Sequence, residues 1–105
     1  MAWFRLDDRF GNHPKVVKAG NSAVGLWVRC GTYSAEHLTD GHIPADVARM
    51  YGTRKEIQAL LTAGLWATNG DGGYVMPDYL DFNPSKAETL AKREAERIRK
   101  ADGSR

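Results

Sequence analysis

The chain has 105 residues, of which 42% are hydrophobic and ten are aromatic, so it is long enough for one domain with a real core and is not a disordered chain. Its net charge of +2 selects no class of partner, but the single cysteine, Cys30, excludes an internal disulfide and a zinc site with four cysteine ligands. Acidic residues near the start replace the apolar run of a secretory signal, and no apolar run approaches the length of a membrane span. We therefore expect a soluble cytoplasmic protein in which Cys30 is buried as a small hydrophobe.

The sequence begins with an aromatic segment and a short helix. Residues Trp3–Leu6 are expected to form a short strand or an extended arm that packs its aromatic rings on the body. Asn12–Pro14 then open a helix of one or two turns, which Gly20 closes.

The longest helix of the body follows. Either Asn21 or Ser22 is predicted to cap it, and it runs to about His37. Apolar residues surround much of this helix, which indicates that it is central and largely buried. Gly25 and Gly31 lower its helix propensity, so they predict close packing against a neighbouring helix.

The stretch Ile43–Met76 predicts a helix, a turn and a second helix, followed by a hairpin. Pro44 fits the first turn of the first helix, and Gly52 is expected to end that helix in the left-handed conformation. Thr53 and Glu56 have the spacing of a capping box, which starts the second helix at once. Three apolar residues at helical spacing form its buried face: Ile57, Leu60 and Leu61.

The hairpin and the elements before it define the expected fold. Asn69–Gly73 is a strong reversal signal between the strands Leu65–Thr68 and Tyr74–Met76, and His42–Ile43 is expected to add a third strand. Helix, turn, helix and hairpin in this order predict a winged helix-turn-helix, an α+β and mainly helical fold that points to DNA.

The C-terminal part predicts a connector and a last helix. Pro77–Phe82 is expected to be irregular, with its aromatic rings folded back onto the core. Ser85 and Glu88 form a second capping box, and the helix behind it has too thin an apolar stripe to be buried, so it should project into solvent or lie on a partner. We divide the chain into a winged-helix domain, residues 1–82, and a basic C-terminal helix, residues 83–105. The second part has seven bases and four acids, or +3, which leaves −1 for the first.

Polar residues of the second helix of the motif are the candidate base-reading residues. They lie off the predicted core face and are chemically able to meet phosphates or base edges. The alternative is that they are ordinary solvated positions of an amphipathic helix. They are Arg54, Lys55, Gln58 and Thr62.

The hairpin and the tail contribute unequally to an expected affinity for DNA. Leu65–Met76 contains no Lys or Arg and has Asp71 at its tip, so we interpret the hairpin as structural. The tail either contacts the DNA backbone, is simply an exposed helix, or associates through Leu90, Ala91 and Ile98. Its candidate backbone-contacting residues are Lys92, Arg93, Arg97, Arg99 and Lys100.

No pattern in the chain indicates an enzyme, a metal site or a cofactor. His37 and His42 flank Asp40 across a turn, which is no recognised ligand spacing, and no phosphate-binding glycine motif is present. The acid pairs of the chain are interpreted as turn and cap residues. All three tryptophans are interpreted as core residues: Trp3, Trp27 and Trp66.

Five runs of the sequence carry a resemblance: Trp3–Asp7, Asn12–Val17, Gly25–Trp27, Ala35–Pro44 and Asp81–Ser85. In these runs the chain resembles a group of small winged-helix proteins from actinobacteria and their phages. More distantly, the chain is similar to the N-terminal domains of phage replication initiators and replisome organisers. The resemblance implies a DNA-associated, non-enzymatic domain, and it carries over no base-contacting residue.

The expected function is therefore DNA binding in phage or prophage replication or transcription control, with protein–protein interaction through the same fold as the alternative. The expected partners are double-stranded DNA, a second copy of the chain in a homodimer, and a host or phage replication or transcription protein. No membrane is expected among them. The location that follows is the host cytoplasm, at the nucleoid.

Overall fold

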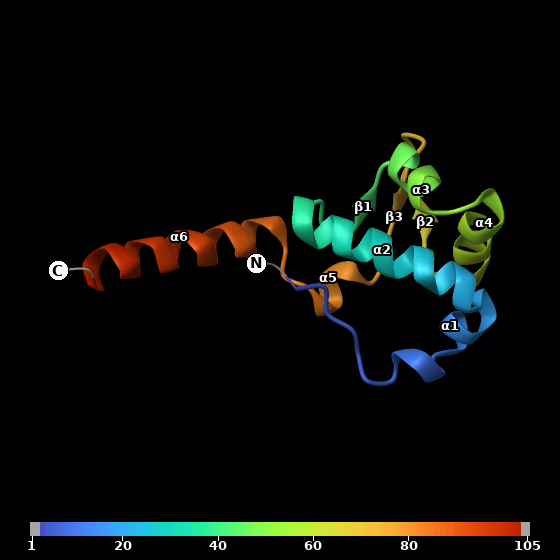
Figure 1. Cartoon of the computed structure of the whole chain (residues 1–105), viewed down its shortest axis with the longest axis horizontal. Helices are drawn as coiled ribbons and strands as arrows, with labels where there is room; N and C mark the ends of the chain where they lie inside the picture. Colours follow the sequence, from blue (N-terminus) through green and yellow to red (C-terminus); the bar gives the residue numbers. More distant parts are fainter. Residues whose placement is uncertain (1–2, 104–105) are drawn as a thin grey trace.

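A computed structural model describes residues 3–103, and Figure 1 shows a helical body with a small sheet and one long helix that leaves it. The architecture is mainly helical with a three-stranded antiparallel sheet, which confirms the predicted α+β class. The elements in chain order are η1 (Phe10–Asn12), α1 (Pro14–Ala19), α2 (Asn21–His37), β1 (His42–Ile43), α3 (Ala45–Tyr51), α4 (Arg54–Ala63), β2 (Ala67–Thr68), β3 (Tyr74–Val75), α5 (Tyr79–Phe82) and α6 (Lys86–Gly103).

Helix α2 is the central element of the body, as predicted, and it packs against α1, α3 and α4. Its N-cap is Gly20, whose φ of 86° suits glycine, and no side chain caps the helix. The prediction that Asn21 or Ser22 caps it is therefore wrong, because the Ser22 hydroxyl donates its hydrogen bond to Glu56 of α4 instead. The buried residues of α2 are Ala23, Leu26, Cys30, Gly31, Ser34 and Ala35.

The segment before α1, which starts at Trp3 and is called the arm below, packs against only one of the two glycines of α2. A Cβ on Gly31 would lie 2.2 Å from Cζ of Phe4, so the arm, rather than a helix, packs closely there. Gly25 is exposed with nothing within 4 Å, and the prediction of close packing at that position is wrong. The prediction that all three tryptophans are core residues is wrong for Trp3, which lies on the arm and is 74% exposed. Trp66 is buried and Trp27 is half-buried.

A tight turn joins α3 and α4. Pro44 is the N-cap of α3, one residue earlier than predicted. Gly52, which follows α3, is extended at φ −147° and is not left-handed, which corrects the prediction. A Cβ at Gly52 would lie 2.6 Å from Cδ2 of Leu26, so glycine is needed here because α2 approaches the turn closely. The buried face of α4 carries Ile57 and Leu60, with Leu61 only half-buried.

The sheet has the order β1-β3-β2, and both pairs are antiparallel. His42 pairs with Val75 in β1–β3, and Ala67 pairs with the same Val75 in β2–β3. The predicted hairpin and third strand are thus confirmed, with shorter strands than expected. Behind the hairpin, the buried Trp66 ring stacks on Tyr74 with 5.1 Å between ring centroids.

The segment after the hairpin is more ordered than predicted. It contains the single-turn helix α5, whose Tyr79 is buried, whereas Phe82 is 51% exposed and does not fold back onto the core. Next to α5, the buried Asn83 accepts a hydrogen bond from the Arg5 N–H at 2.8 Å and donates one to the Tyr79 carbonyl at 3.0 Å. Asn83 therefore ties the arm, α5 and the root of α6 together.

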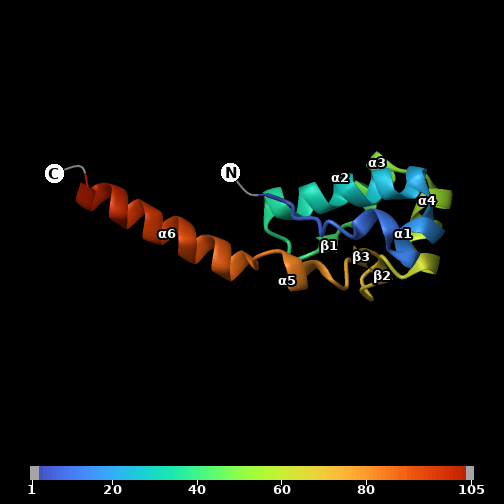
Figure 2. The same ribbon diagram turned by 90° about the horizontal axis from the view of Figure 1, so that it is seen from below.

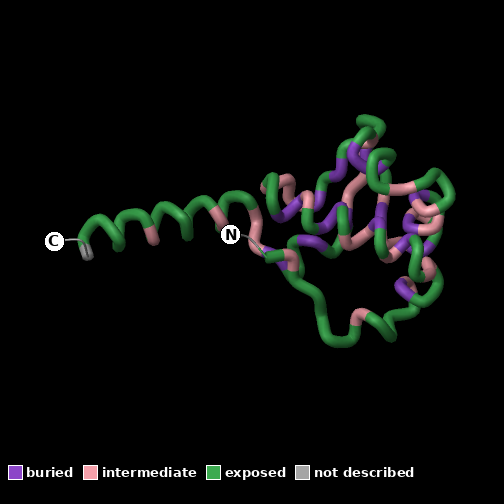
Figure 3. The backbone as a smooth tube through the Cα atoms, in the orientation of Figure 1, coloured by how far each residue is buried: buried purple, intermediate pink, exposed green. Residues whose placement is uncertain are grey.

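Helix α6 projects from the body, as Figures 1 and 2 show from two directions. The predicted capping box at its start is confirmed by the bond from the Glu88 N–H to Ser85 Oγ and by the return bond to Glu88 Oε1. The Asp40 carboxylate accepts a further bond from the Lys86 N–H at 2.6 Å, so the body also caps this helix. Figure 3 shows that buried residues lie within the body and that α6 is exposed along most of its length. Among the helices of residues 3–103, none is long and apolar enough to cross a membrane.

Candidate nucleic-acid interface

One exposed face of α4 brings together the four candidate base-reading residues. Arg54, Lys55, Gln58 and Thr62 are all exposed, which confirms that they lie off the core face. Arg54, Gln58 and Thr62 follow one another at intervals of four residues, so they form a stripe along the helix. Within this stripe the Gln58 Nε2 donates a hydrogen bond to Thr62 Oγ1 at 3.3 Å. This helix surface therefore presents two cations together with hydrogen-bond donors and acceptors.

The acid of the first turn of α4 is occupied by local bonds. Glu56 Oε1 accepts the Thr53 N–H at 2.7 Å, and the Glu56 N–H donates to Thr53 Oγ1 at 3.2 Å, so the predicted capping box is confirmed. The other carboxylate oxygen accepts the Ser22 hydroxyl of α2. The bond from Ser22, followed by those from Thr53, lowers the pKa of Glu56 from its ordinary value. The carboxylate therefore anchors α4 to α2.

The lowered pKa of Glu56 predicts a contribution to stability that depends on pH. Because the folded state favours the ionised carboxylate, this contribution is present above the pKa of the unfolded chain, about 4.5, and is lost as the pH falls through the lower folded-state value. Ser22→Ala should therefore lower the free energy of unfolding at pH 7, and its difference from the wild type should shrink toward pH 3 in urea titrations. A constant difference at both pH values would contradict this account, and the exposed neighbour variant Asn21→Ala is the control.

A third cation approaches α4 from α2 and adds to Arg54 and Lys55. The guanidinium of Arg29 lies over the Tyr51 ring, 5.7 Å from its centroid, at the end of α3. Tyr51 is separated from the start of α4 by the turn alone, so Arg29 is held beside the turn that leads into the candidate face. No local sequence pattern predicts this place for Arg29, because the contact joins residues 22 positions apart.

The hairpin uses its polar side chains internally. Asn69 Oδ1 accepts the Asp71 N–H at 3.2 Å, and Asp71 Oδ1 accepts the Gly73 N–H at 3.0 Å. Asn69 Nδ2 also lies 3.3 Å from Nδ1 of His42, which connects the loop to β1. These bonds agree with the interpretation of the hairpin as a structural element, since its side chains hold the turn.

The candidate tail residues form a separate group. Lys92, Arg93, Arg97, Arg99 and Lys100 are all exposed on α6. In this group Arg97 donates to Glu94 at 3.1 Å, and this bond lowers the pKa of that carboxyl. Figures 1 and 2 both place α6 and α4 at opposite ends of the molecule, whose longest extent is 56 Å. The structure therefore does not bring the two predicted groups together.

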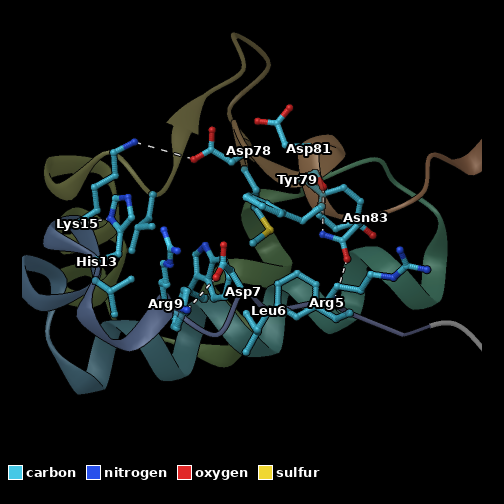
Figure 4. A pocket seen from close by; sticks show the side chains of 17 residues that line it. Arg5, Leu6, Asp7, Arg9, His13, Lys15, Asp78, Tyr79, Asp81 and Asn83 are labelled. Carbon is cyan, nitrogen blue, oxygen red and sulfur yellow. Dashed lines mark hydrogen bonds and ion pairs between the residues drawn. The ribbon is translucent and has the colours of Figure 1, made fainter.

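A hollow of about 330 Å³ lies between the arm and α5. Its apolar wall includes Phe10 and Trp27, whose rings stack with 4.6 Å between centroids. Figure 4 shows charged residues of both signs around it, and the Lys15 ammonium lies 4.0 Å from the Asp78 carboxylate. Among the residues that line it, Leu6 and Phe82 are exposed apolar side chains.

The other reactive side chains are dispersed. Burial raises the pKa of the Cys30 thiol to about 12, so the thiol stays protonated and unreactive at neutral pH. His42 lies against Asn69, whereas His37 lies beside Glu36 and the Tyr33 ring, so the two histidines and Asp40 do not converge. Within the part of the chain that the structure describes, no three His, Cys, Asp or Glu residues are grouped so as to hold a metal ion.

No protein-family model, curated protein or solved structure matches this chain.

Proposed function

We propose that the chain is a DNA-binding protein of winged-helix fold, acting without enzymatic activity in phage or prophage replication or transcription control at the host nucleoid. The order of helix, strand, two helices and hairpin, with β3 between β1 and β2, supports this fold. The observation that carries the function is the exposed face of α4, with Arg54, Lys55, Gln58 and Thr62 along a helix of suitable length for a major groove.

Because α4 and α6 lie at opposite ends of the molecule, we propose that they make different contacts with the DNA. The exposed bases of α6 would supply most of the phosphate contacts, while α4 would meet base edges and add phosphate contacts through Arg54 and Lys55. A span of 56 Å corresponds to about 16 base pairs at 3.4 Å each. A duplex must therefore be at least about this long for both ends of one molecule to touch it.

A salt titration of the full-length chain with a labelled duplex of about 24 base pairs tests the proposal. The logarithm of the binding constant should fall linearly with the logarithm of salt concentration. Arg54→Gln/Lys55→Gln should reduce the slope by about 1.8 and lower the affinity near 0.1 M salt by up to about 60-fold, because two phosphate contacts are lost. A matched double variant on the arm, Arg5→Gln/Arg9→Gln, should have a smaller effect. Undetectable binding at low salt would overturn the proposal.

A second candidate function is a protein-interaction module, and the hollow beside the arm favours it. Its aromatic wall and the exposed side chains of Leu6 and Phe82 suit an apolar anchor residue of a protein partner. In this case Leu6→Asp should abolish the biological role, and the double substitution at Arg54 and Lys55 should leave it intact. The opposite pattern would support DNA binding.

A further inference from the structure

We infer that Gln58 reads an adenine in the DNA and that Thr62 holds the Gln58 amide in the orientation for this contact; the inference rests on the proposed function. Gln58 lies in the middle of α4, one turn after Arg54 and one turn before Thr62, and all three are exposed. In Figure 1, α4 lies at the outer edge of the body, at the end opposite α6.

The hydrogen bond between Gln58 and Thr62 leaves a defined set of free groups. A glutamine amide has two N–H donors and one carbonyl acceptor. One N–H is given to Thr62 Oγ1 at 3.3 Å. The second N–H and the carbonyl oxygen Oε1 stay available on an exposed side chain. Gln58 therefore keeps one donor and one acceptor on the same exposed amide.

Among the bases, adenine has the complementary pair in the major groove. Its N7 accepts a hydrogen bond and its N6 amino group donates one, so the free N–H and Oε1 of Gln58 satisfy both at once. Guanine presents two acceptors, N7 and O6, which would place an acceptor against Oε1. Thymine presents an acceptor and a methyl group, and cytosine presents a single amino donor, so neither forms the bidentate pair.

Thr62 acts as a positioning residue, since its bond restricts the amide before any DNA is present. A free glutamine side chain loses rotamer freedom on binding, and this loss weakens a contact. Because the bond from Nε2 to Oγ1 already restricts the side chain in the free protein, less rotamer freedom is lost on binding. Arg54, on the same stripe, is placed to contact the adjoining backbone or bases, so the stripe combines anchoring with readout.

Binding selection tests the inference with the full-length chain and a pool of duplexes of about 24 base pairs whose central base pairs are randomised. The wild type should select adenine at one position. Gln58→Ala should lose the preference at that position alone, and Gln58→Glu should shift it toward cytosine, because a carboxylate only accepts hydrogen bonds. Thr62→Val, which keeps the branched shape without the hydroxyl, should weaken the preference, and Thr62→Ser should retain it.

Replacing the selected adenine by 7-deazaadenine provides a second readout. It removes the N7 acceptor and should weaken wild-type binding by about tenfold or more, with little effect on Gln58→Ala. The inference is overturned if the protein binds DNA but Gln58→Ala weakens all sequences equally, or if Thr62→Val leaves the adenine preference unchanged. If the protein binds no duplex at low salt, the proposed function fails together with the inference. If it binds DNA without the adenine preference of Gln58, the inference alone fails. Unchanged thermal unfolding of each variant controls for misfolding.

Discussion

Neutralising the exposed bases of α6 should lower the affinity of the chain for duplex DNA by at least about 100-fold near 0.1 M salt. If all five bases contact phosphates, the salt slope should fall by about 4.5, because each contact releases about 0.9 of a counterion. The loss exceeds that expected for α4, which has two bases on its candidate face. The substitutions, each to glutamine, are at Lys92, Arg93, Arg97, Arg99 and Lys100.

Glutamine retains helix propensity, so the measurement separates charge from folding. The opposite control is Glu88→Gln/Glu96→Gln, which should raise the affinity and steepen the salt slope, since it removes repulsion from the same helix. The affinity of the wild type should also decrease when the duplex is shortened below about 16 base pairs, whereas the affinity of the neutralised variant should change little. Equal salt slopes for the neutralised variant and the wild type would show that α6 does not touch DNA.

Leu60→Ala should lower the free energy of unfolding by about 2–5 kcal/mol, a large effect for a single substitution. Leu60 is fully buried in the core cluster where α4 packs on α2, and its backbone carbonyl also accepts the N–H groups of Leu65 and Trp66 after the helix. Alanine leaves these backbone bonds in place but opens a cavity among residues that cannot collapse fully around it. Urea unfolding monitored by circular dichroism measures the change.

A matched comparison is available on the same helix. Leu61→Ala removes the same atoms from a half-buried position and should cost clearly less than Leu60→Ala. Thr62→Ala, at an exposed position, should change stability by about 0.5 kcal/mol or less. Equal costs at Leu60 and Leu61 would contradict the packing of α4 described above.

The features that the sequence predicted correctly depend on residues close together in the chain. The capping boxes of Thr53–Glu56 and Ser85–Glu88 are satisfied within one turn, and the hairpin depends on the loop Asn69–Gly73. The exposure of the candidate residues on α4 follows from the 3.6-residue period of its buried face. These patterns depend on contacts between near neighbours, so a short stretch of sequence is enough to predict them.

The incorrect predictions depend on contacts between distant residues. The sequence predicts Gly52 in the left-handed region, but Gly52 is extended and leaves room for Leu26, which no local pattern pairs with it. Gly31 and Gly25 both lie inside the predicted helix, and the sequence predicts close packing at each. Only Gly31 is closely packed, because Phe4 lies against it. The same applies to Arg29, whose place beside the candidate face is determined by the packing of α2 against α3.

Asp40 connects the body to the root of α6. It is one of two non-glycine residues with positive φ among residues 3–103, at 54°, and its carboxylate accepts the first N–H of α6. The start of α6 is thus bonded to a residue from the middle of the chain as well as to its own preceding segment. For a partner that binds both helices, as proposed, the capped root of α6 replaces part of a flexible connection, which raises the effective concentration for the second contact.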